Sequence, residues 1–441
     1  MTDEQHTPAA AEPSGSAAAA VTPGTTGLSR RGLIGLALGA GATGLVVGAG
    51  GGLVGGAAYG QEQARQAMDA VAPASGIHQP GITTPVQDHL HFAAYDMMAR
   101  TTRDDLAELL SDWTYAATRM MQGLDVSATG AVGGSPEAPP DDTGEAVGLP
   151  ASNLTITFGF GPSLFDARFG LEGQKPAGLE RLPAFLNDDL DPLRSDGDLC
   201  IQACADDPQV AVHAIRNLSR IAFGRATIRW SQLGFGRTSK TTADQATPRN
   251  LFGYKDGTAN ILADDTAALD ENVWVSASDG PAWLAGGSYL VARRIAMLIE
   301  TWDRTRLAEQ DRVVGRDKGA GAPLSGGDEF TAPDFGATDA TGKPRIDPRS
   351  HVSLAHPDNN GGVRILRRGY NFVDGTTDLG RLNAGLFFLS FQKSPDRFIT
   401  LQKALSTDAM GEYLRHVGSG LWAVPPAPAA GASIGAGLLG A

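Results

Sequence analysis

The sequence is poor in cysteine and in positive charge, and both shortages exclude classes of protein. Its 441 residues include only two cysteines, too few for a disulfide framework or a four-cysteine zinc site. Acidic residues number 49 against 36 basic ones, and the net charge of −13 argues against nucleic acid as a partner. Apolar residues still make up 42% of the chain, so a folded core is expected rather than general disorder.

The first 61 residues have the pattern of an export signal. Arg30 and Arg31 precede a glycine-rich, mildly apolar stretch that carries no charge before Glu62. Adjacent arginines in this position are typical of a twin-arginine (Tat) signal, which a receptor reads. An uncleaved membrane anchor is the alternative, although so much glycine makes a poor helix. The G-x-G-x-x-G pattern at Gly39–Gly44 has no preceding strand and is not taken as a dinucleotide site.

The body of the chain repeats one order of elements. In the first half, apolar periodicity predicts the order β-α-β-β-α-β, which is the ferredoxin-like unit. Its elements are expected at 89–95, 104–121, 154–160, 199–204, 207–223 and 227–233. The second half repeats the pattern with elements at 288–297, 301–314, 365–372, 385–392, 395–405 and 421–424. A Gly/Asp/Pro-rich loop at 315–349 is too long for a plain connector, which favours a functional loop.

These patterns predict an α+β fold made of two ferredoxin-like (βαββαβ) halves. The expected division is an export signal at 1–61, a linker at 62–79, an N-terminal domain at 80–245, a C-terminal domain at 246–426 and a flexible tail at 427–441. The boundary between the halves falls in the polar stretch near 238–247.

The segment Gly253-Tyr-Lys-Asp256-Gly257 opens the part of the chain richest in chemistry. Two glycines around an aspartate are typical of a tight turn that presents a carboxylate. Taken alone, the segment is better explained by a surface Asx turn than by a functional site. Asn260 adds polar capacity at the same bend.

Two histidines and a pair of arginines follow in the same half. His351 and His356 lie in a polar segment, where a structural, hydrogen-bonded role is favoured over that of a ligand for either histidine taken alone. Arg367 and Arg368 belong to an expected strand, and alternation places them on opposite faces of it. An arginine among apolar strand residues needs an anionic partner.

A carboxylate, an imidazole and an arginine in one domain are the parts of a haem peroxidase. The imidazole holds the iron from one side. On the other side, a base must take a proton from hydrogen peroxide and return it to the leaving oxygen. A fixed guanidinium stabilises the charge that builds as the O–O bond breaks.

The sequence resembles the dye-decolourising (DyP-type) haem peroxidases over roughly residues 78–426. The segment from Gly253 to Gly257 matches the family motif G-x-x-D-G, and the segments Ser350-His351-Val and Arg367-Arg368-Gly-Tyr follow in the same order. The Tat-like signal and the opening at residues 78–85 are similar to the exported branch of the family. That branch includes the deferrochelatase/peroxidase component of the Efe iron-uptake system.

The resemblance implies a fold of the dimeric α+β barrel type with one haem b per chain in the C-terminal half. It implies that Asp256 is the distal acid/base, that Arg367 stabilises O–O cleavage, and that His351 is the iron ligand. Further haem-binding residues implied in this way are Gly257, Thr258, Ala259, His356, Pro357, Asp358 and Arg367. His356 is the rival axial ligand. Glu412 is the candidate acceptor for the N–H of the proximal imidazole.

The expected function is oxidation of bulky organic reductants or dyes by hydrogen peroxide. A deferrochelatase that releases iron from haem for an uptake system is the alternative, and a non-catalytic haem or copper-linked envelope protein is a third. Expected partners are peroxide, small-molecule or dye reductants, iron-uptake or copper-linked envelope proteins and a second copy of the chain, but not nucleic acid. The expected location after Tat export is the periplasm, the cell envelope or the exterior.

Several other residues carry weaker signals. Aromatic residues that could relay electrons from the surface, although a core role is favoured for each, are Trp302, Tyr289 and Tyr370. His89 and His91 share one strand face but lack a further metal ligand nearby, so packing is favoured. Cys200 and Cys204 have the wrong spacing for a redox pair and are expected to be buried.

Overall fold

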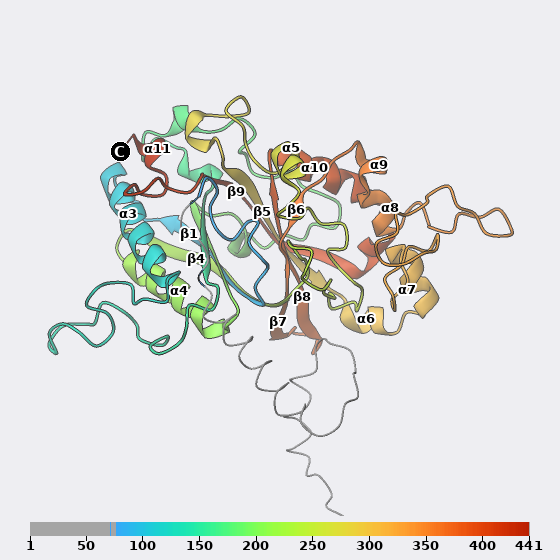
Figure 1. Ribbon diagram of the computed structural model, residues 1–441, viewed down its shortest axis with the longest axis horizontal. Helices are drawn as coiled ribbons and strands as arrows, with labels where there is room; N and C mark the ends of the chain where they lie inside the picture. The colour runs from blue at the N-terminus through green and yellow to red at the C-terminus, as the bar shows by residue number, and fades with distance from the viewer. Residues whose placement is uncertain (1–70, 72–75, 441) are drawn as a thin grey trace, which may run out of the picture. The chain divides into compact units, whose positions relative to one another are not determined.

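In the computed structural model, which describes residue 71 and residues 76–440, nine strands form one antiparallel sheet (Figure 1). Neighbouring strands follow the order β5-β9-β2-β3-β1-β4-β7-β8-β6, and β5 pairs with β8 as well. This extra pairing closes eight of the strands into a ring, so the sheet is barrel-like and the fold is α+β. The expected export signal lies outside the described residues, as does most of the expected linker.

The first half of the described chain has the element order expected from its periodicity. Its bounds are β1 (His89–Met97), α3 (Arg103–Met120), β2 (Thr155–Phe160), β3 (Leu199–Ala205), α4 (Pro208–Ile221) and β4 (Ala226–Arg237). Helix α3 begins with a capping box, in which the Thr102 side chain and the Asp105 side chain each bind the other residue's backbone N–H. Helix α4 begins at Pro208 behind the N-cap Asp207, which is why the chain turns sharply there.

The second half follows the same plan with more interruptions. Its elements are α5 (Thr266–Asn272), β5 (Ser288–Met297), α6 (Ile299–Asp303), α7 (Leu307–Val314), α8 (His351–Ala355), α9 (Pro357–Asn360), β6 (Leu366–Arg367), β7 (Tyr370–Thr376), β8 (Leu382–Gln392), α10 (Pro395–Ala404), β9 (Leu414–Val424) and α11 (Ala436–Leu439). The helix expected at 301–314 is two helices, and the strand expected at 365–372 is two strands. Both β6 and β7 pair with β8 in the same register, and the strand is interrupted between them at Arg368 and Gly369, although the Arg368 N–H still donates to the carbonyl of Leu389 at 2.9 Å.

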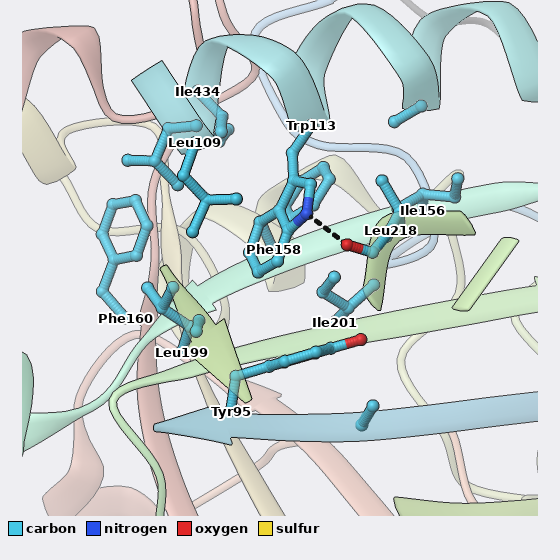
Figure 2. Packing of buried hydrophobic residues seen from close by; sticks show 14 of the residues in the cluster. Tyr95, Leu109, Trp113, Ile156, Phe158, Phe160, Leu199, Ile201, Leu218 and Ile434 are labelled. Atoms are coloured by element: carbon cyan, nitrogen blue, oxygen red, sulfur yellow. Dashed lines mark hydrogen bonds between the residues drawn. The ribbon is translucent and has the colours of Figure 1, made fainter. Parts of the chain in front are cut away.

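Helix α4 packs against β1 and β3, and α3 packs beside α4, with Trp113 of α3 pointing towards Phe158 of β2 in the main core (Figure 2). Trp113 of α3 is fully buried there, and its indole N–H donates to the carbonyl of Leu218 at 2.8 Å. Its ring lies 5.3 Å from that of Tyr95 and 5.7 Å from that of Phe158. This half is well packed and contains none of the expected haem-site residues.

Strand-to-strand pairing between the two halves is limited to two short stretches, and the loop at 187–196 adds backbone hydrogen bonds to residues 416–419 of β9. Strands β2 and β9 share one residue pair, Phe160 with Ala423, and β4 pairs with β7 at two positions. The fully buried Arg368 adds a side-chain tie, because its guanidinium donates to the carbonyl of Thr84 at 2.6 Å and to the side chain of Gln87. The anionic partner expected for a strand arginine is replaced by backbone carbonyl and amide oxygens.

The C-terminal segment differs from the expected flexible tail. Ile434 and Leu438 are buried in the main core, and Arg103 donates to the carbonyl of Leu439 at 3.0 Å. Apolar residues between the glycines and alanines anchor this segment, and composition alone concealed them. Among the described residues, no helix combines the length and the apolar character needed to cross a bilayer.

Candidate active site

His351 is the first residue of α8, and its imidazole is oriented by a carboxylate. Ser350 caps the helix by accepting from the backbone N–H of Ser353 at 3.3 Å. The Nδ1 of His351 donates to Oδ2 of Asp408 at 2.6 Å. Nε2 makes no hydrogen bond to any described residue, and the side chain stays 34% exposed. The ring thus offers one free nitrogen in a fixed direction, as a metal ligand requires.

The acceptor for this imidazole corrects an expectation. Asp408, whose side chain is only 7% exposed, holds Nδ1, so the choice of Glu412 for that role is wrong. Burial works to lower the pKa of His351, but the Asp408 carboxylate outweighs it and keeps that pKa above its usual value. Asp408 also caps a 3₁₀ turn by accepting from the N–H of Met410 at 2.9 Å, which fixes the carboxylate itself.

Asp256 lies in a small hairpin closed by backbone bonds. Its N–H donates to the carbonyl of Pro248 at 2.9 Å, and the next residue, Gly257, has a φ of +91°. A Cβ at Gly257 would come within 2.7 Å of the Ser239 Cα, so both the conformation and the space require glycine. The turn expected from the sequence is present, and it presents a carboxylate that is 13% exposed.

Arg367 meets this carboxylate from β6. Its Nη1 donates to Oδ1 of Asp256 at 2.6 Å across 111 residues of sequence. Oδ2 of Asp256 has a longer contact, 3.2 Å from the amide of Asn250. The alternation expected for the arginine pair holds, because Arg367 is 28% exposed and faces Asp256 while Arg368 is buried on the other side.

Asn260 fixes the backbone of Arg367. Its Oδ1 accepts from the N–H of Arg367 at 2.8 Å, and its Nδ2 donates to the carbonyl of Arg367 at 2.9 Å. The same amide donates to the carbonyl of Lys240 at 2.8 Å. A single buried side chain therefore holds the short strand β6 beside the Asp256 hairpin, and Asn260 proves more important than its sequence signal suggested.

The three expected groups lie within electrostatic range of one another. Asp256 acts to raise the pKa of His351 and Arg367 acts to lower it, after the larger effects of burial and Asp408. These groups fit a haem, because one imidazole nitrogen of His351 has no partner among the described residues and could hold the iron, while Asp256 and Arg367 form a pair. Two small cavities, of about 30 and 20 Å³, lie away from these residues and are far too small for a porphyrin.

The other expected haem contacts occupy the neighbouring turns. His356 caps α9, where its Nδ1 accepts from the N–H of Asp358 at 3.3 Å, and its ring lies 5.1 Å from that of Phe335. Thr258 donates to Glu329 at 3.3 Å. Glu329 comes from the long loop at 315–349 and was not singled out from the sequence.

Most of the residues with weaker sequence signals are buried or partly buried in the described part of the chain. No group of three or more His, Cys, Asp or Glu able to hold a metal ion occurs among the described residues. Cys200 and Cys204 are free thiols in the barrel interior, buried as expected. Trp302 is buried against Phe252, with ring centroids 4.2 Å apart.

Comparison with known proteins places the chain in a family. Residues 79–236 match the N-terminal domain of Dyp-type peroxidases, and residues 247–429 match the C-terminal domain. The chain therefore belongs to the Dyp-type peroxidase family.

Individual relatives agree with this assignment. A dye-decolorizing peroxidase of Thermobifida fusca is 39% identical over 370 residues, 81% of this chain and 82% of that one. A deferrochelatase of Escherichia coli K12 is 38% identical over 374 residues, 83% of this chain and 87% of that one. The oxyferrous complex of DtpA from Streptomyces lividans is 41% identical with a TM-score of 0.78, covering 85% of this chain and 99% of that one. The protein is a haem peroxidase, and its cofactor is haem b.

Proposed function

We propose that His351 binds the haem iron through Nε2 and that Asp256 and Arg367 act together on hydrogen peroxide. The observation that carries the proposal is the 2.6 Å contact between Arg367 and Asp256, held in place by Asn260. Asp408 supports the proximal role of His351, because a carboxylate on Nδ1 fixes the ring and raises the basicity of the other nitrogen. Haem would supply the iron that binds peroxide and the redox capacity that the side chains lack.

Asp256 has two oxygens with different partners, which suggests separate tasks. Oδ1 is occupied by Arg367, whereas Oδ2 has only the 3.2 Å contact with Asn250. Oδ2 is thus the better placed oxygen to accept a proton from peroxide and to return it to the departing oxygen, which leaves as water. Arg367 holds the carboxylate and offers positive charge where negative charge develops.

Around these three residues we propose a haem-lining set taken from the family pattern. It comprises Gly257, Thr258, Ala259, His356, Pro357 and Asp358. Thr258 belongs to the turn that carries Asp256, and His356 ends the helix that carries His351. His356 stays the alternative iron ligand. The backbone N–H of Asp358 occupies its Nδ1, which argues against this role, whereas its partly exposed ring supports it.

Two variants test the assignment. His351→Ala is expected to lose bound haem, seen as loss of the Soret band from the purified protein. Asp256→Asn is expected to keep the Soret band but to slow the reaction with stoichiometric peroxide by about 10²–10⁴-fold. His356→Ala is the matched control for the ligand and is expected to retain haem. A His351→Ala protein with an unchanged Soret band would overturn the ligand assignment.

Oxidation of bulky reductants or dyes is the activity we favour, and haem iron release is the second candidate. The deferrochelatase relatives, 38% identical over most of their length, support the second. The Asp256–Arg367 pair supports the first, because a protein that only binds or empties haem has no use for a peroxide acid/base. Product analysis after incubation with haem separates them: metal-free protoporphyrin supports iron release, and intact haem opposes it.

We further propose the division at 1–61, 62–79, 80–245 and 246–426, with two ferredoxin-like halves of the dimeric α+β barrel type. The order β-α-β-β-α-β in the first half and the strand order β2-β3-β1-β4 support this reading. Arg30 and Arg31 support Tat export to the periplasm or envelope, where iron-uptake or copper-linked proteins, or a second copy of the chain, would be partners.

A further inference from the structure

Glu329 of the long loop at 315–349 binds the residues on both sides of Asp256. Lys255, which precedes Asp256, donates to Oε2 of Glu329 through Nζ. Thr258, two residues after Asp256, donates to Oε1 at 3.3 Å. The Glu329 side chain is 11% exposed and that of Lys255 is 25% exposed. The two oxygens of one carboxylate therefore hold the Asp256 turn from either side.

Hydrogen bonds from a buried arginine hold the segment that carries Glu329. Arg316, which is largely buried, donates to the carbonyl of Gly321 and to the carbonyl of Glu329, both at 2.7 Å. The stem of Lys255 lies on Gly321, where a Cβ would come within 2.8 Å of the Lys255 Cδ. Burial acts to raise the pKa of Glu329, but Lys255, Thr247 and Thr258 together outweigh it and keep that pKa below its usual value. Glu329 is thus an ionised anchor.

Other contacts tie the rest of the hairpin to the same region. Arg249 donates to the carbonyls of Lys318 and Gly319, at 2.6 and 2.7 Å. Tyr254 donates to Asp311 at 2.5 Å. These bonds hold the hairpin in place, but among the described residues only Glu329 binds side chains both before and after Asp256, those of Lys255 and Thr258.

We propose that Glu329 is a positioning residue that sets the orientation of the Asp256 carboxylate through Lys255 and Thr258. The inference rests on the proposed role of Asp256 and extends it to the long loop. Proton transfer demands that donor and acceptor meet within hydrogen-bond reach, and a displacement of about 1 Å can cost on the order of 10²-fold in rate. Loss of the Glu329 carboxylate keeps the Asp256 side chain but removes the bonds that fix the turn carrying it.

The experiment compares two variants of the haem-loaded protein. Glu329→Gln removes the charge of the carboxylate, and Lys255→Met removes the ammonium group that binds it. We expect each to slow the reaction with peroxide about tenfold, to keep the Soret band, and to raise hydrogen exchange across residues 250–258. Lys255→Arg keeps the charge and is expected to restore most of the rate. The matched control is the Lys175–Glu180 ion pair in the first half, of which Glu180 is exposed. Glu180→Gln should change neither the rate of the peroxide reaction nor the hydrogen exchange at 250–258.

A double variant separates this inference from the proposed function. With Asp256→Asn already present, Glu329→Gln is expected to add no further loss of rate, because both act through one carboxylate. Equal slowing by Glu329→Gln in both backgrounds, or unchanged exchange at 250–258, would overturn the positioning role alone. An Asp256→Asn protein that reacts at the wild-type rate would overturn the proposed function instead, while the exchange measurement still reports whether Glu329 holds the turn.

Discussion

The imidazole of His351 and the carboxylate of Asp408 meet at 2.6 Å although 57 residues separate them in the sequence. Helix α8 supplies the first and a 3₁₀ turn before β9 supplies the second. Since the short contact leaves Nε2 free, the pair has the form of a metal ligand and its orienting carboxylate. Asp408 and Glu412 lie on the same turn, but only Asp408 contacts the imidazole.

Asp408→Asn is expected to weaken haem binding about ten- to a hundredfold, because the amide no longer fixes the tautomer and direction of the ring. The measurement is a Soret titration of the apoprotein with haem. Glu412→Gln, on the same turn, should bind haem like the wild type. If Glu412→Gln weakened haem binding more than Asp408→Asn did, the His351 ring would be held differently in the haem-loaded protein.

The adjacent arginines are expected to respond in opposite ways. Arg368→Met should lower the free energy of unfolding on the order of 3 kcal/mol, since it leaves the carbonyl of Thr84 and the side chain of Gln87 buried without a donor. Arg367→Met should cost less stability but slow the peroxide reaction about 10²–10³-fold. Urea unfolding and stopped-flow absorbance measure the two effects, and equal stability losses would contradict the assigned environments.

A graded series at Asn260 tests how the Arg367 backbone is held. Asn260→Ala removes one acceptor and two donor bonds at a buried position, so the free energy of unfolding should fall by about 1–3 kcal/mol and the peroxide rate should fall with it. Asn260→Asp keeps the acceptor for the N–H of Arg367 and should lie between alanine and wild type in rate. An alanine variant with the wild-type rate would mean that β6 pairing alone positions Arg367.

His91 gives the fold a predicted sensitivity to acid. Burial lowers its pKa from 6.5 to about 4, so in this pH range the unfolded chain takes up a proton before the folded one does. Stability should therefore fall as the pH drops from 6.5 towards 4, by up to about 3 kcal/mol from this residue. Denaturation midpoints at pH 7 and pH 4.5 should differ less for His91→Gln than for the wild type. A difference of the same size in both proteins would remove His91 as a cause.

The sequence by itself determined the types of the elements and the principal chemistry-bearing residues. Strand β1 follows from alternation, β3 follows from a short and mostly apolar run, and the turn at Asp256 follows from its flanking glycines. Local periodicity carried less information where a strand is interrupted, which is why the break between β6 and β7 at Gly369 was not foreseen.

Tertiary structure alone decided which groups meet. Asp408 rather than Glu412 reaches the imidazole because the turn before β9 aims one carboxylate inward. Glu329 reaches Lys255 because the long loop returns to the hairpin, and no local pattern records where a loop of that length ends. Periodicity reports which face of an element is apolar, whereas a contact across many residues depends on how the closed sheet brings distant segments together.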